Sequence, residues 1–362
     1  MRIIITGGGT GGHLFPGIAL AESLRQRFPG CEILFIGTQR QLDRDALAGL
    51  GFQQEAIACM GLKGMGLAHR LKSLISLPKA IAEACRIIKQ FQPALVFGVG
   101  GYVTGPVLVA AKLLGIPACI HEQNAIPGLA NWLTARFVNK VFVSIPGSYP
   151  FPPAKTVVSG NPVRKEILAA AERRQVRRPT RPLTFLVMGG SLGAHRVNML
   201  MLEAAQHIRE RNPFPFRLIH QTGAADADEV RAGYAAAGIV AEVAPFFKDM
   251  AAVYAQADLA VARAGATSLA ELAVTGLPAL LIPYPYAADD HQAANAGYYL
   301  AGGGAKMYRE EELDGRRLAA VLMLLAEDAD KLTRMGAAMR RMAVPDAAER
   351  ILTECMKLIE KA

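Results

Sequence analysis

The residue types best able to do chemistry stand just after short apolar runs. His13 follows the apolar run Arg2–Ile5 and the glycine-rich turn Thr6–Gly12, and Pro16 suits the first turn of a helix. This order places His13 at the carboxyl end of a predicted strand, where open α/β sheets bind ligands. His13 is therefore a candidate site residue, and a histidine that only caps the turn is the alternative.

A run of four polar residues, His121-Glu122-Gln123-Asn124, follows the predicted strand Ala118–Ile120. Consecutive polar side chains at a strand end are more typical of a ligand site than of a hydrophobic core. We therefore expect all four to lie outside the core. A solvated loop is the alternative.

The segment Gly265–Glu271 follows the predicted strand Leu259–Ala262 and opens a helix that Gly276 closes. Backbone N–H groups at such a helix start can bind an anion or a sugar hydroxyl. Glu271 could bind both hydroxyls of a ribose through its two oxygens. The spacing of Ser268 and Glu271 fits a capping box equally well, so both interpretations stay open.

Other acidic motifs give weaker signals. The segment Asp289–Gln292, with Asn295, could bind a sugar or could simply begin a helix. The motifs Asp226-Ala-Asp228 and Asp328-Ala-Asp330 are similar to metal-binding pairs of nucleotide-sugar enzymes, but their polar, helical contexts predict solvated faces. We therefore predict no metal site.

The opening glycines also match a dinucleotide fingerprint, Gly7-x-Gly9-x-x-Gly12. That fingerprint expects an acid about 20 residues later, where this chain has Gly37-Thr38 at the end of the second predicted strand. A nicotinamide-dependent oxidoreductase is therefore a weak interpretation. The chain has neither a G-x-x-x-x-G-K-[ST] loop nor a G-x-S-x-G motif, which argues against ATP hydrolysis and against a nucleophile elbow.

Alternating strand and helix patterns must position these residues, and they predict an α/β protein with doubly wound parallel sheets. The order of strand, glycine turn and helix recurs after Leu183, so we expect two Rossmann-like halves divided near the Pro/Gly-rich passage Ile145–Pro153. The expected strands are Arg2–Ile5, Glu32–Ile36, Leu95–Phe97, Ala118–Ile120, Lys140–Val143, Leu183–Met188, Arg217–His220, Ala241–Val243, Leu259–Ala262 and Ala279–Ile282. The expected helices include Pro16–Phe28, Asp43–Leu47, Val197–Ile208, Glu229–Ala236, Met250–Ala255, Ser268–Val274 and Ala347–Ile359.

Composition limits the class of protein. The 362 residues are 52% hydrophobic with a mean hydropathy of +0.22, which is enough for two domains with sizeable cores. The five cysteines are scattered, which indicates a reducing compartment without a disulfide framework or a structural zinc. A strand predicted at the N-terminus leaves no room for a signal peptide.

Charge is distributed unevenly. Residues 1–160 hold 15 Lys and Arg against 7 Asp and Glu, whereas the rest of the chain is nearly neutral. A basic first half suggests a phosphate-rich partner or an anionic membrane surface. The basic, partly amphipathic segment Leu71–Lys89 could lie on such a surface or pack as a helix on the sheet. The uncharged stretch Phe91–Ala111 is rich in glycine and proline, so we predict a strand, a loop and a helix there instead of a membrane span.

Six motifs stand in order along the chain: Gly8-Gly-Thr-Gly-Gly-His13, Gly100-Gly-Tyr-Val-Thr-Gly-Pro106, His121-Glu-Gln-Asn124, Gly160-Asn-Pro-Val-Arg164, Gly189-Gly-Ser191 and Gly265-Ala-x-x-x-x-Glu271. This order is that of the MurG family of peptidoglycan N-acetylglucosaminyltransferases, which the chain resembles nearly end to end. The resemblance implies a GT-B fold of two Rossmann-like domains. It implies an acceptor and membrane-facing domain at 1–160 plus 345–362 and a UDP-GlcNAc donor domain at 161–344.

The resemblance also implies a reaction in cell-wall biogenesis. GlcNAc would move from UDP-GlcNAc to the C4 hydroxyl of MurNAc in lipid I (undecaprenyl-diphosphate-MurNAc-pentapeptide), with inversion at the anomeric carbon, to give lipid II. No cofactor and no tightly bound metal are implied. The partners would be both substrates, anionic lipids and other cell-wall synthesis proteins, with no nucleic acid. The enzyme would lie peripherally on the cytoplasmic face of the plasma (inner) membrane.

The matched motifs imply the site residues. His13 would be the general base, since a neutral imidazole can accept the acceptor's proton, and Glu122 would be the rival base or would orient the acceptor. The donor would be bound by Thr10, Gly11, Gly12, Asn124, Arg164, Ser191, Phe247, Ala266, Thr267, Ser268, Glu271, His291 and Gln292. Among these, the Phe247 backbone would bind uracil and Glu271 the ribose. The acceptor would face Gly100, Gly101 and Tyr102, and the membrane would face Lys72, Leu74, Ile75, Leu77, Lys79 and Ile81.

Two alternatives stay beside the transferase. A non-hydrolysing UDP-sugar 2-epimerase would share the fold and the nucleotide but would need no acceptor and no lipid-facing basic surface. A non-catalytic adaptor would bind UDP-GlcNAc or vesicles without turnover. Release of UDP only in the presence of an acceptor separates the transferase from both.

Overall fold

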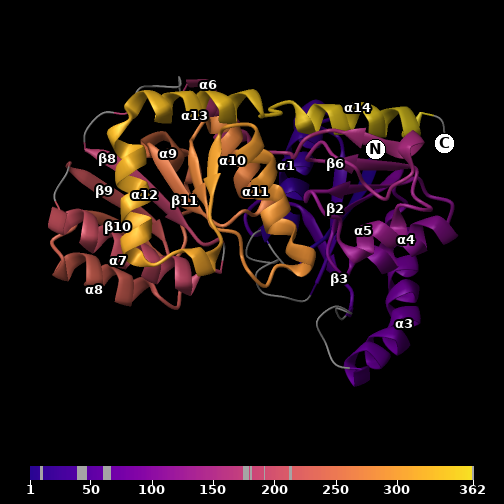
Figure 1. Cartoon of the computed structure of the whole chain (residues 1–362). Helices are drawn as coiled ribbons and strands as arrows, with labels where there is room; N and C mark the ends of the chain where they lie inside the picture. The colour runs from indigo at the N-terminus through magenta and orange to yellow at the C-terminus, as the bar shows by residue number, and fades with distance from the viewer. Residues whose placement is uncertain are drawn as a thin grey trace. The chain divides into compact units, whose positions relative to one another are not determined.

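The computed structural model describes residues 1–8, 11–38, 47–59, 67–173, 179, 182–190, 192–211 and 214–360, with the backbone alone for 67–75. The chain divides into two compact units (Figure 1). The first comprises Met1–Arg164 with Val344–Ala362, and the second comprises Lys165–Ala343. Each unit is built on one parallel sheet, which confirms the predicted fold of two Rossmann-like α/β halves.

The first unit contains a seven-stranded parallel sheet in the order β3-β2-β1-β4-β5-β6-β7. Its strands are β1 (Arg2–Gly7), β2 (Glu32–Gly37), β3 (Gln53–Ala56), β4 (Leu95–Gly100), β5 (Ala118–Glu122), β6 (Lys140–Val143) and β7 (Thr156–Val158). Its helices are α1 (Gly11–Arg27), α3 (Leu67–Phe91), α4 (Thr104–Leu113), α5 (Leu129–Thr134), the 3₁₀ turn η1 (Pro153–Lys155) and α14 (Ala347–Ile359).

Alternation along β1 assigns the helices of this unit to the two faces of the sheet. Ile3 and Ile5 belong to a core cluster with residues of α1 and α14, whereas Ile4 belongs to a second cluster with residues of α3 and α4. Successive side chains of a strand point to opposite faces, so both faces of β1 are buried by helices. Figure 1 shows α14 beside α1, although more than 300 residues separate them in sequence. Because helices cover both faces of β1, its apolar run is continuous and does not alternate with polar residues.

The second unit contains a six-stranded parallel sheet in the order β10-β9-β8-β11-β12-β13. Its strands are β8 (Leu183–Met188), β9 (Phe216–Gln221), β10 (Ala241–Ala244), β11 (Leu259–Ala262), β12 (Ala279–Leu281) and β13 (Ala305–Met307). Its helices are α6 (Lys165–Arg173), α7 (His195–Arg211), α8 (Ala227–Ala236), α9 (Met250–Gln256), α10 (Ala266–Thr275), α11 (His291–Ala301), α12 (Gly315–Glu327), α13 (Ala329–Arg341) and the 3₁₀ turns η2 (Ala288–Asp290) and η3 (Glu310–Glu312). Phe185 and Val187 of β8 lie in one core cluster with residues of α7 and α12.

Most expected elements are present, and the differences have local causes. The helix expected from Pro16 begins at Gly11, so Pro16 is its sixth residue, where the missing N–H removes one i→i−4 hydrogen bond of the helix. The strands β3, β7 and β13 were not predicted, because none exceeds four residues and none has a continuous apolar pattern. The helix expected at 43–47 lies almost entirely outside the described residues.

The uncharged stretch Phe91–Ala111 forms β4 and the greater part of α4, as predicted. Its glycines make the sharp turn between these two elements. In the part of the chain that the structure describes, no helix combines the length and the hydrophobicity that a bilayer crossing needs. Gly276 ends α10 in the left-handed conformation with φ of 63°, also as predicted.

Candidate active site

His13 lies at the carboxyl edge of the first sheet. It is the third residue of α1, and its half-buried ring packs against the turn after β4. A side chain at Gly100 would place its Cβ 2.7 Å from His13 Nδ1, and Gly100 has φ of +100°, so this position requires glycine. The Thr104 hydroxyl donates to the carbonyls of Gly100 and Thr6, at 2.8 and 3.2 Å. The β1 and β4 turns are therefore fixed to each other beneath His13.

The polar run after β5 corrects one expectation. His121, Glu122 and Gln123 are buried, with at most 1% of each exposed, because β5 continues through Glu122. Only Asn124 is half-buried. Gln123 reaches across the sheet edge, and its Oε1 lies 3.1 Å from His13 Nδ1. The run therefore forms a buried polar network behind His13 instead of an exposed ligand-binding loop.

Both carboxylate oxygens of Glu122 are occupied by hydrogen-bond donors. Oε1 accepts from the backbone N–H of Asn124 at 2.9 Å and from its side-chain amide at 3.3 Å. Oε2 accepts from the N–H of Gly128 and from Asn131 Nδ2, both at 2.9 Å. A buried carboxylate with four donors is suited to holding the loop 124–128 in place. The geometry favours His13 over Glu122 as a proton acceptor.

The remaining candidates of the first unit lie around the same edge. Gly11 is buried and Gly12 is exposed at the start of α1, and Gly101 and Tyr102 follow β4, with Tyr102 41% exposed. Arg164 was assigned to the donor domain, but it belongs to the first unit, where its guanidinium lies 4.8 Å from the centre of the Phe15 ring.

In the second unit, the start of α10 lies at the carboxyl edge of the sheet. The helix begins at Ala266 with Gly265 as its N-cap, and no side chain caps it. Ser268 is the third helical residue, so the capping-box interpretation is wrong. Glu271 is 5% exposed, and its Oε2 accepts a hydrogen bond of 2.8 Å from the Tyr254 hydroxyl. The amides that begin this helix, Ala266 to Ser268, provide the positive end of a helix dipole.

Gln221, the last residue of β9, connects two turns of this edge. Its Nε2 donates to the Gly190 carbonyl at 3.2 Å, and its Oε1 accepts from the Phe247 N–H at 3.1 Å. Sequence reasoning missed Gln221, although its position at a strand end was a usable signal. The amide therefore fixes the Phe247 backbone relative to the glycine turn after β8.

Gln292 has a similar connecting role. Its Oε1 accepts from the backbone N–H groups of Ala264 and Tyr284, at 3.2 and 2.9 Å, and so joins the loops after β11 and β12. His291 begins α11, and its Nδ1 lies 2.8 Å from the Ala288 carbonyl, which makes Nδ1 the donor and leaves Nε2 as the acceptor. Both predicted donor residues thus stand at the same edge as α10.

Two acidic motifs have structural partners. Arg309 donates to both carboxylate oxygens of Asp290, and these hydrogen bonds hold the pKa of Asp290 below its ordinary value. Asp226 was predicted on a solvated face, but it is buried and accepts from Asn198 at 2.7 Å. Although burial alone would raise the pKa of Asp226, hydrogen bonds from His195 and Asn198 lower it overall. Asp226 therefore belongs to a buried network behind the sheet edge.

Several predicted residues lie outside this description. Thr10 and Ser191 are not among the described residues, and for Lys72, Leu74 and Ile75 only the backbone of α3 is described. In the described side chains of α3, Lys79 is exposed and Leu77 is half-buried. Ile81 is half-buried and packs against the core cluster that contains Ala80, Ala84 and Ile88, so this end of the helix packs on the sheet.

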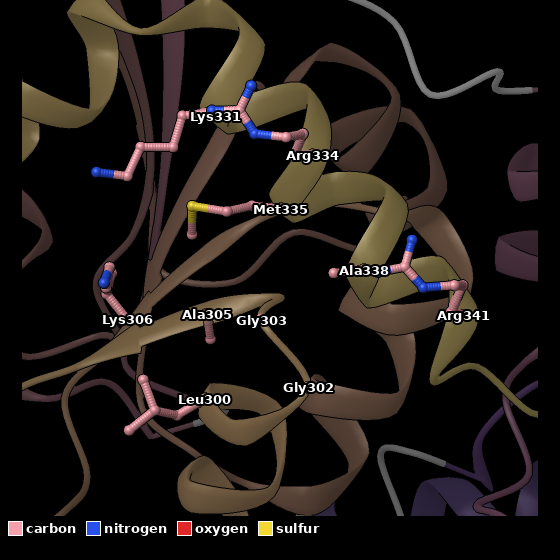
Figure 2. A pocket seen from close by; sticks show the side chains of 10 residues that line it. All are labelled: Leu300, Gly302, Gly303, Ala305, Lys306, Lys331, Arg334, Met335, Ala338 and Arg341. Carbon is pink, nitrogen blue, oxygen red and sulfur yellow. The ribbon is translucent and has the colours of Figure 1, made fainter.

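A separate hollow lies at the opposite edge of the second sheet, where β13 begins (Figure 2). It has a volume of about 350 Å³ between α13 and the turn from α11 to β13, with Met335 and Leu300 among its lining residues. Lys306, Lys331 and Arg341 line it as well. None of the predicted site residues that the structure describes is among the lining residues, since those of the second unit lie at the carboxyl edge.

Comparison with known families assigns the two halves of the chain separately. Residues 3–143 match the glycosyltransferase family 28 N-terminal domain, and residues 184–351 match the glycosyltransferase family 28 C-terminal domain. The enzyme of Desulfotalea psychrophila named UDP-N-acetylglucosamine--N-acetylmuramyl-(pentapeptide) pyrophosphoryl-undecaprenol N-acetylglucosamine transferase is 48% identical, and the match covers 99% of this chain and 97% of that protein. The enzyme of the same name from Geotalea daltonii is 45% identical, with 98% and 97% covered.

Comparison with solved structures also finds a transferase of this kind. The crystal structure of Acinetobacter baumannii MurG matches with a TM-score of 0.79 and 31% identity over 98% of this chain and 99% of that chain. The UDP-GlcNAc 2-epimerase of Neisseria meningitidis, solved with UDP-GlcNAc bound, has a TM-score of 0.69 over 99% of this chain and all of that chain, but only 13% identity. The second likeness establishes a shared fold and no more.

Proposed function

This chain belongs to the family of UDP-N-acetylglucosamine--N-acetylmuramyl-(pentapeptide) pyrophosphoryl-undecaprenol N-acetylglucosamine transferases, and we propose that it transfers GlcNAc from UDP-GlcNAc to lipid I. The product is lipid II, with a β-1,4 bond to the C4 oxygen of MurNAc. Identity of 48% over nearly the whole chain supports the transferase over the epimerase, whose structural relative is only 13% identical.

The observation that carries the chemistry is the placement of His13. It stands half-buried at the carboxyl edge of the first sheet, with Nδ1 held by the Gln123 amide and the ring packed on Gly100. Nε2 is the nitrogen that remains to accept a proton from the acceptor hydroxyl. Glu122 acts through the loop 124–128, which it holds in place, and therefore positions Asn124 instead of moving a proton.

The donor groups of the second unit fit a nucleotide-sugar. Glu271, oriented by Tyr254, accepts hydrogen bonds from the ribose hydroxyls, and the backbone at Phe247, fixed by Gln221, binds the uracil. The diphosphate lies at the N-terminal end of α10, whose dipole and amides stabilise negative charge. His291 and Gln292 contact the GlcNAc from the next loop along the same sheet edge.

The reaction that we propose is a single displacement. The C4 oxygen of the acceptor attacks the anomeric carbon while its proton passes to His13 Nε2. The bond from the anomeric carbon to the β-phosphate oxygen breaks, and UDP leaves with that electron pair. Charge that develops on the leaving phosphate is stabilised by the amides at the start of α10. One displacement inverts the anomeric configuration, as a β-linkage from an α-linked donor requires.

Lipid I carries a diphosphate and a polyprenyl chain, so the first unit must reach a membrane surface. Its excess of basic residues matches an anionic leaflet, and α3 supplies exposed Lys79 on a helix whose first half stands clear of the other labelled elements of this unit in Figure 1. We place the enzyme peripherally on the cytoplasmic face of the membrane, where both substrates are present.

The decisive experiment measures UDP release from UDP-GlcNAc with and without a short-chain lipid I analogue. We expect release only with the acceptor, together with a β-1,4 disaccharide product. In His13→Gln, kcat should fall by about 10²–10⁴ while UDP-GlcNAc binding is kept, because general-base catalysis contributes that much. His207→Gln, at a partly exposed position of α7, is the matched control. Absence of acceptor-dependent release by the wild type would reject the transferase.

A further inference from the structure

We infer that Gln123 is a positioning residue that fixes the tautomer of His13, with the proton on Nδ1 and the lone pair on Nε2. The inference rests on the proposed role of His13 as the general base. A neutral imidazole carries its proton on either nitrogen, and only the nitrogen without it can accept one. The tautomer is therefore as important to the reaction as the position of the ring.

The orientation of the Gln123 amide follows from its other contacts. One side of the amide lies 2.8 Å from the Val99 carbonyl and 3.3 Å from the His121 carbonyl. A carbonyl oxygen only accepts hydrogen bonds, so the amide nitrogen must be on this side. The opposite orientation would place two oxygens 2.8 Å apart. Oε1 therefore faces His13 Nδ1, at 3.1 Å, and requires a proton there.

His121 supports the same orientation from the other end of the network. It is completely buried, and burial lowers its pKa to about 4, so it is neutral at physiological pH. Its Nε2 lies 3.1 Å from the Gly160 carbonyl, which only accepts, so Nε2 holds the proton. Nδ1 of His121 then accepts from Gln123 Nε2 at 3.1 Å. Ser144 Oγ, 3.0 Å from the same Nε2, can adapt because its hydroxyl rotates.

The donor and the acceptor of each hydrogen bond from His13 to the two backbone carbonyls are therefore fixed. Val99 and Gly160 supply acceptors that cannot be reversed, and Gln123 transmits that choice to His13. In serine proteases a buried aspartate holds the catalytic histidine in this manner. Here the holding group is a neutral amide, so it selects the tautomer without adding a negative charge beside the imidazole.

The first test observes the tautomer directly. The protein holds seven histidines, so selective ¹⁵N-histidine labelling gives a small set of ring signals, and His13→Gln identifies those of His13. At pH 8 we expect a protonated Nδ1 and an unprotonated Nε2 in the wild type. A His13 ring protonated mainly at Nε2 would overturn the inference. This readout needs no substrate and does not depend on the proposed reaction.

The second test removes the side-chain oxygen of Gln123 that accepts the hydrogen bond from His13 Nδ1. In Gln123→Met we expect a mixture of His13 tautomers and a fall in kcat of about 10- to 100-fold, with KM for UDP-GlcNAc unchanged. Protonated Gln123→Glu keeps an oxygen toward Nδ1 while its O–H donates to the Val99 carbonyl, so at a pH where this buried carboxyl is protonated it should restore the Nδ1–H tautomer and most of the activity. Gln54→Met, the same change on exposed β3 of the same sheet, should change neither.

The outcomes separate the two proposals. A folded Gln123→Met with the wild-type tautomer, or with full kcat, rejects the positioning role of Gln123. A wild type with the expected tautomer but without acceptor-dependent UDP release rejects the transferase and leaves the assignment of the tautomer standing. Should Gln123→Met fail to fold, the spectrum of the wild type still decides whether Nδ1 holds the proton.

Discussion

The Tyr254 hydroxyl donates a hydrogen bond of 2.8 Å to Glu271 Oε2, and the two residues are 1% and 5% exposed. Tyr254 belongs to α9 and Glu271 to α10, so the bond joins two helices beneath the carboxyl edge of the second sheet. It fixes the direction of a carboxylate that would otherwise have several rotamers. A pre-oriented carboxylate can bind the ribose without losing side-chain freedom on binding.

Tyr254→Phe should therefore weaken donor binding with little effect on the chemical step. A hydrogen bond to a charged group contributes about 1.5–3 kcal/mol, so Kd for UDP-GlcNAc should rise by up to roughly 10- to 150-fold, measured by calorimetry. Tyr234→Phe is the matched control, because Tyr234 is equally buried in the same unit and bonds His220 at 2.8 Å. Equal changes in Kd for the two variants would show that only general stability was altered.

Gln221 should control recognition of the base. Gln221→Met removes both the acceptor of the Phe247 N–H and the donor to Gly190, whereas Gln221→Glu keeps the acceptor. We expect affinity for UDP to fall about tenfold in the first variant and less in the second, since each neutral hydrogen bond contributes about 1 kcal/mol. Gln256→Met, at a half-buried position near the end of α9, is the control. Unchanged UDP affinity in Gln221→Met would exclude this role.

The fold was largely predictable because strands and helices leave periodic apolar patterns. Lys140–Val143, Leu183–Met188 and Ala347–Ile359 have the predicted bounds, since each is a strong pattern between clear breaks. The strand β13 is only three residues long, follows three glycines and contains an exposed lysine, so no local pattern marked it.

The candidate site was predictable only in part. Motif order pointed to His13 and Glu271, but nothing in a sequence shows which distant residue will bond them. Gln123 lies 110 residues from His13, and Tyr254 lies 17 residues from Glu271 on another helix. The burial of Glu122 was missed for a related reason. A polar run looks solvated until the four donors that satisfy the carboxylate are known.

Two buried histidines should make the protein sensitive to acid. Burial lowers the pKa of His121 to about 4 and that of His220 to about 3, both well below the ordinary value of 6.5. Below pH 6.5 the unfolded chain takes up protons that the folded chain does not bind, so stability is kept above pH 6.5 and is lost as the pH falls. Each histidine should lower the free energy of unfolding of its own unit by up to about 1.4 kcal/mol per pH unit between pH 6 and pH 4.5.

Urea unfolding followed by fluorescence of the single tryptophan, Trp132, reports on the first unit. We expect its stability to decline between pH 6 and pH 4.5 in the wild type and to decline less steeply in His121→Gln, whatever the stability of that variant at pH 7.5. His207→Gln should keep the wild-type slope, because this histidine is partly exposed on α7. Equal slopes in the wild type and His121→Gln would show that other groups cause the acid sensitivity.

Lys79 should contribute to binding of anionic membranes. The first half of α3 stands clear of the other labelled elements of its unit, whereas residues 80–88 pack on the sheet (Figure 1). Lys79 is exposed at the junction of the two halves, and Lys89 is exposed ten residues later. Ten helical residues span about 15 Å, which exceeds the Debye length of about 8 Å at physiological salt, so only Lys79 is close to a surface that the first half contacts.

Lys79→Glu should weaken binding to vesicles containing phosphatidylglycerol by about tenfold or more, because a basic residue near such a surface contributes about 1 kcal/mol and the reversal removes one charge and adds an opposing one. Lys89→Glu makes the same change in net charge on the same helix and should have a much smaller effect. Binding is measured by vesicle sedimentation at two salt concentrations, and the difference between the variants should shrink at the higher one. Equal losses of vesicle binding in the two variants would mean that the total charge of the protein, and not the position of Lys79 beside the first half of α3, determines membrane binding.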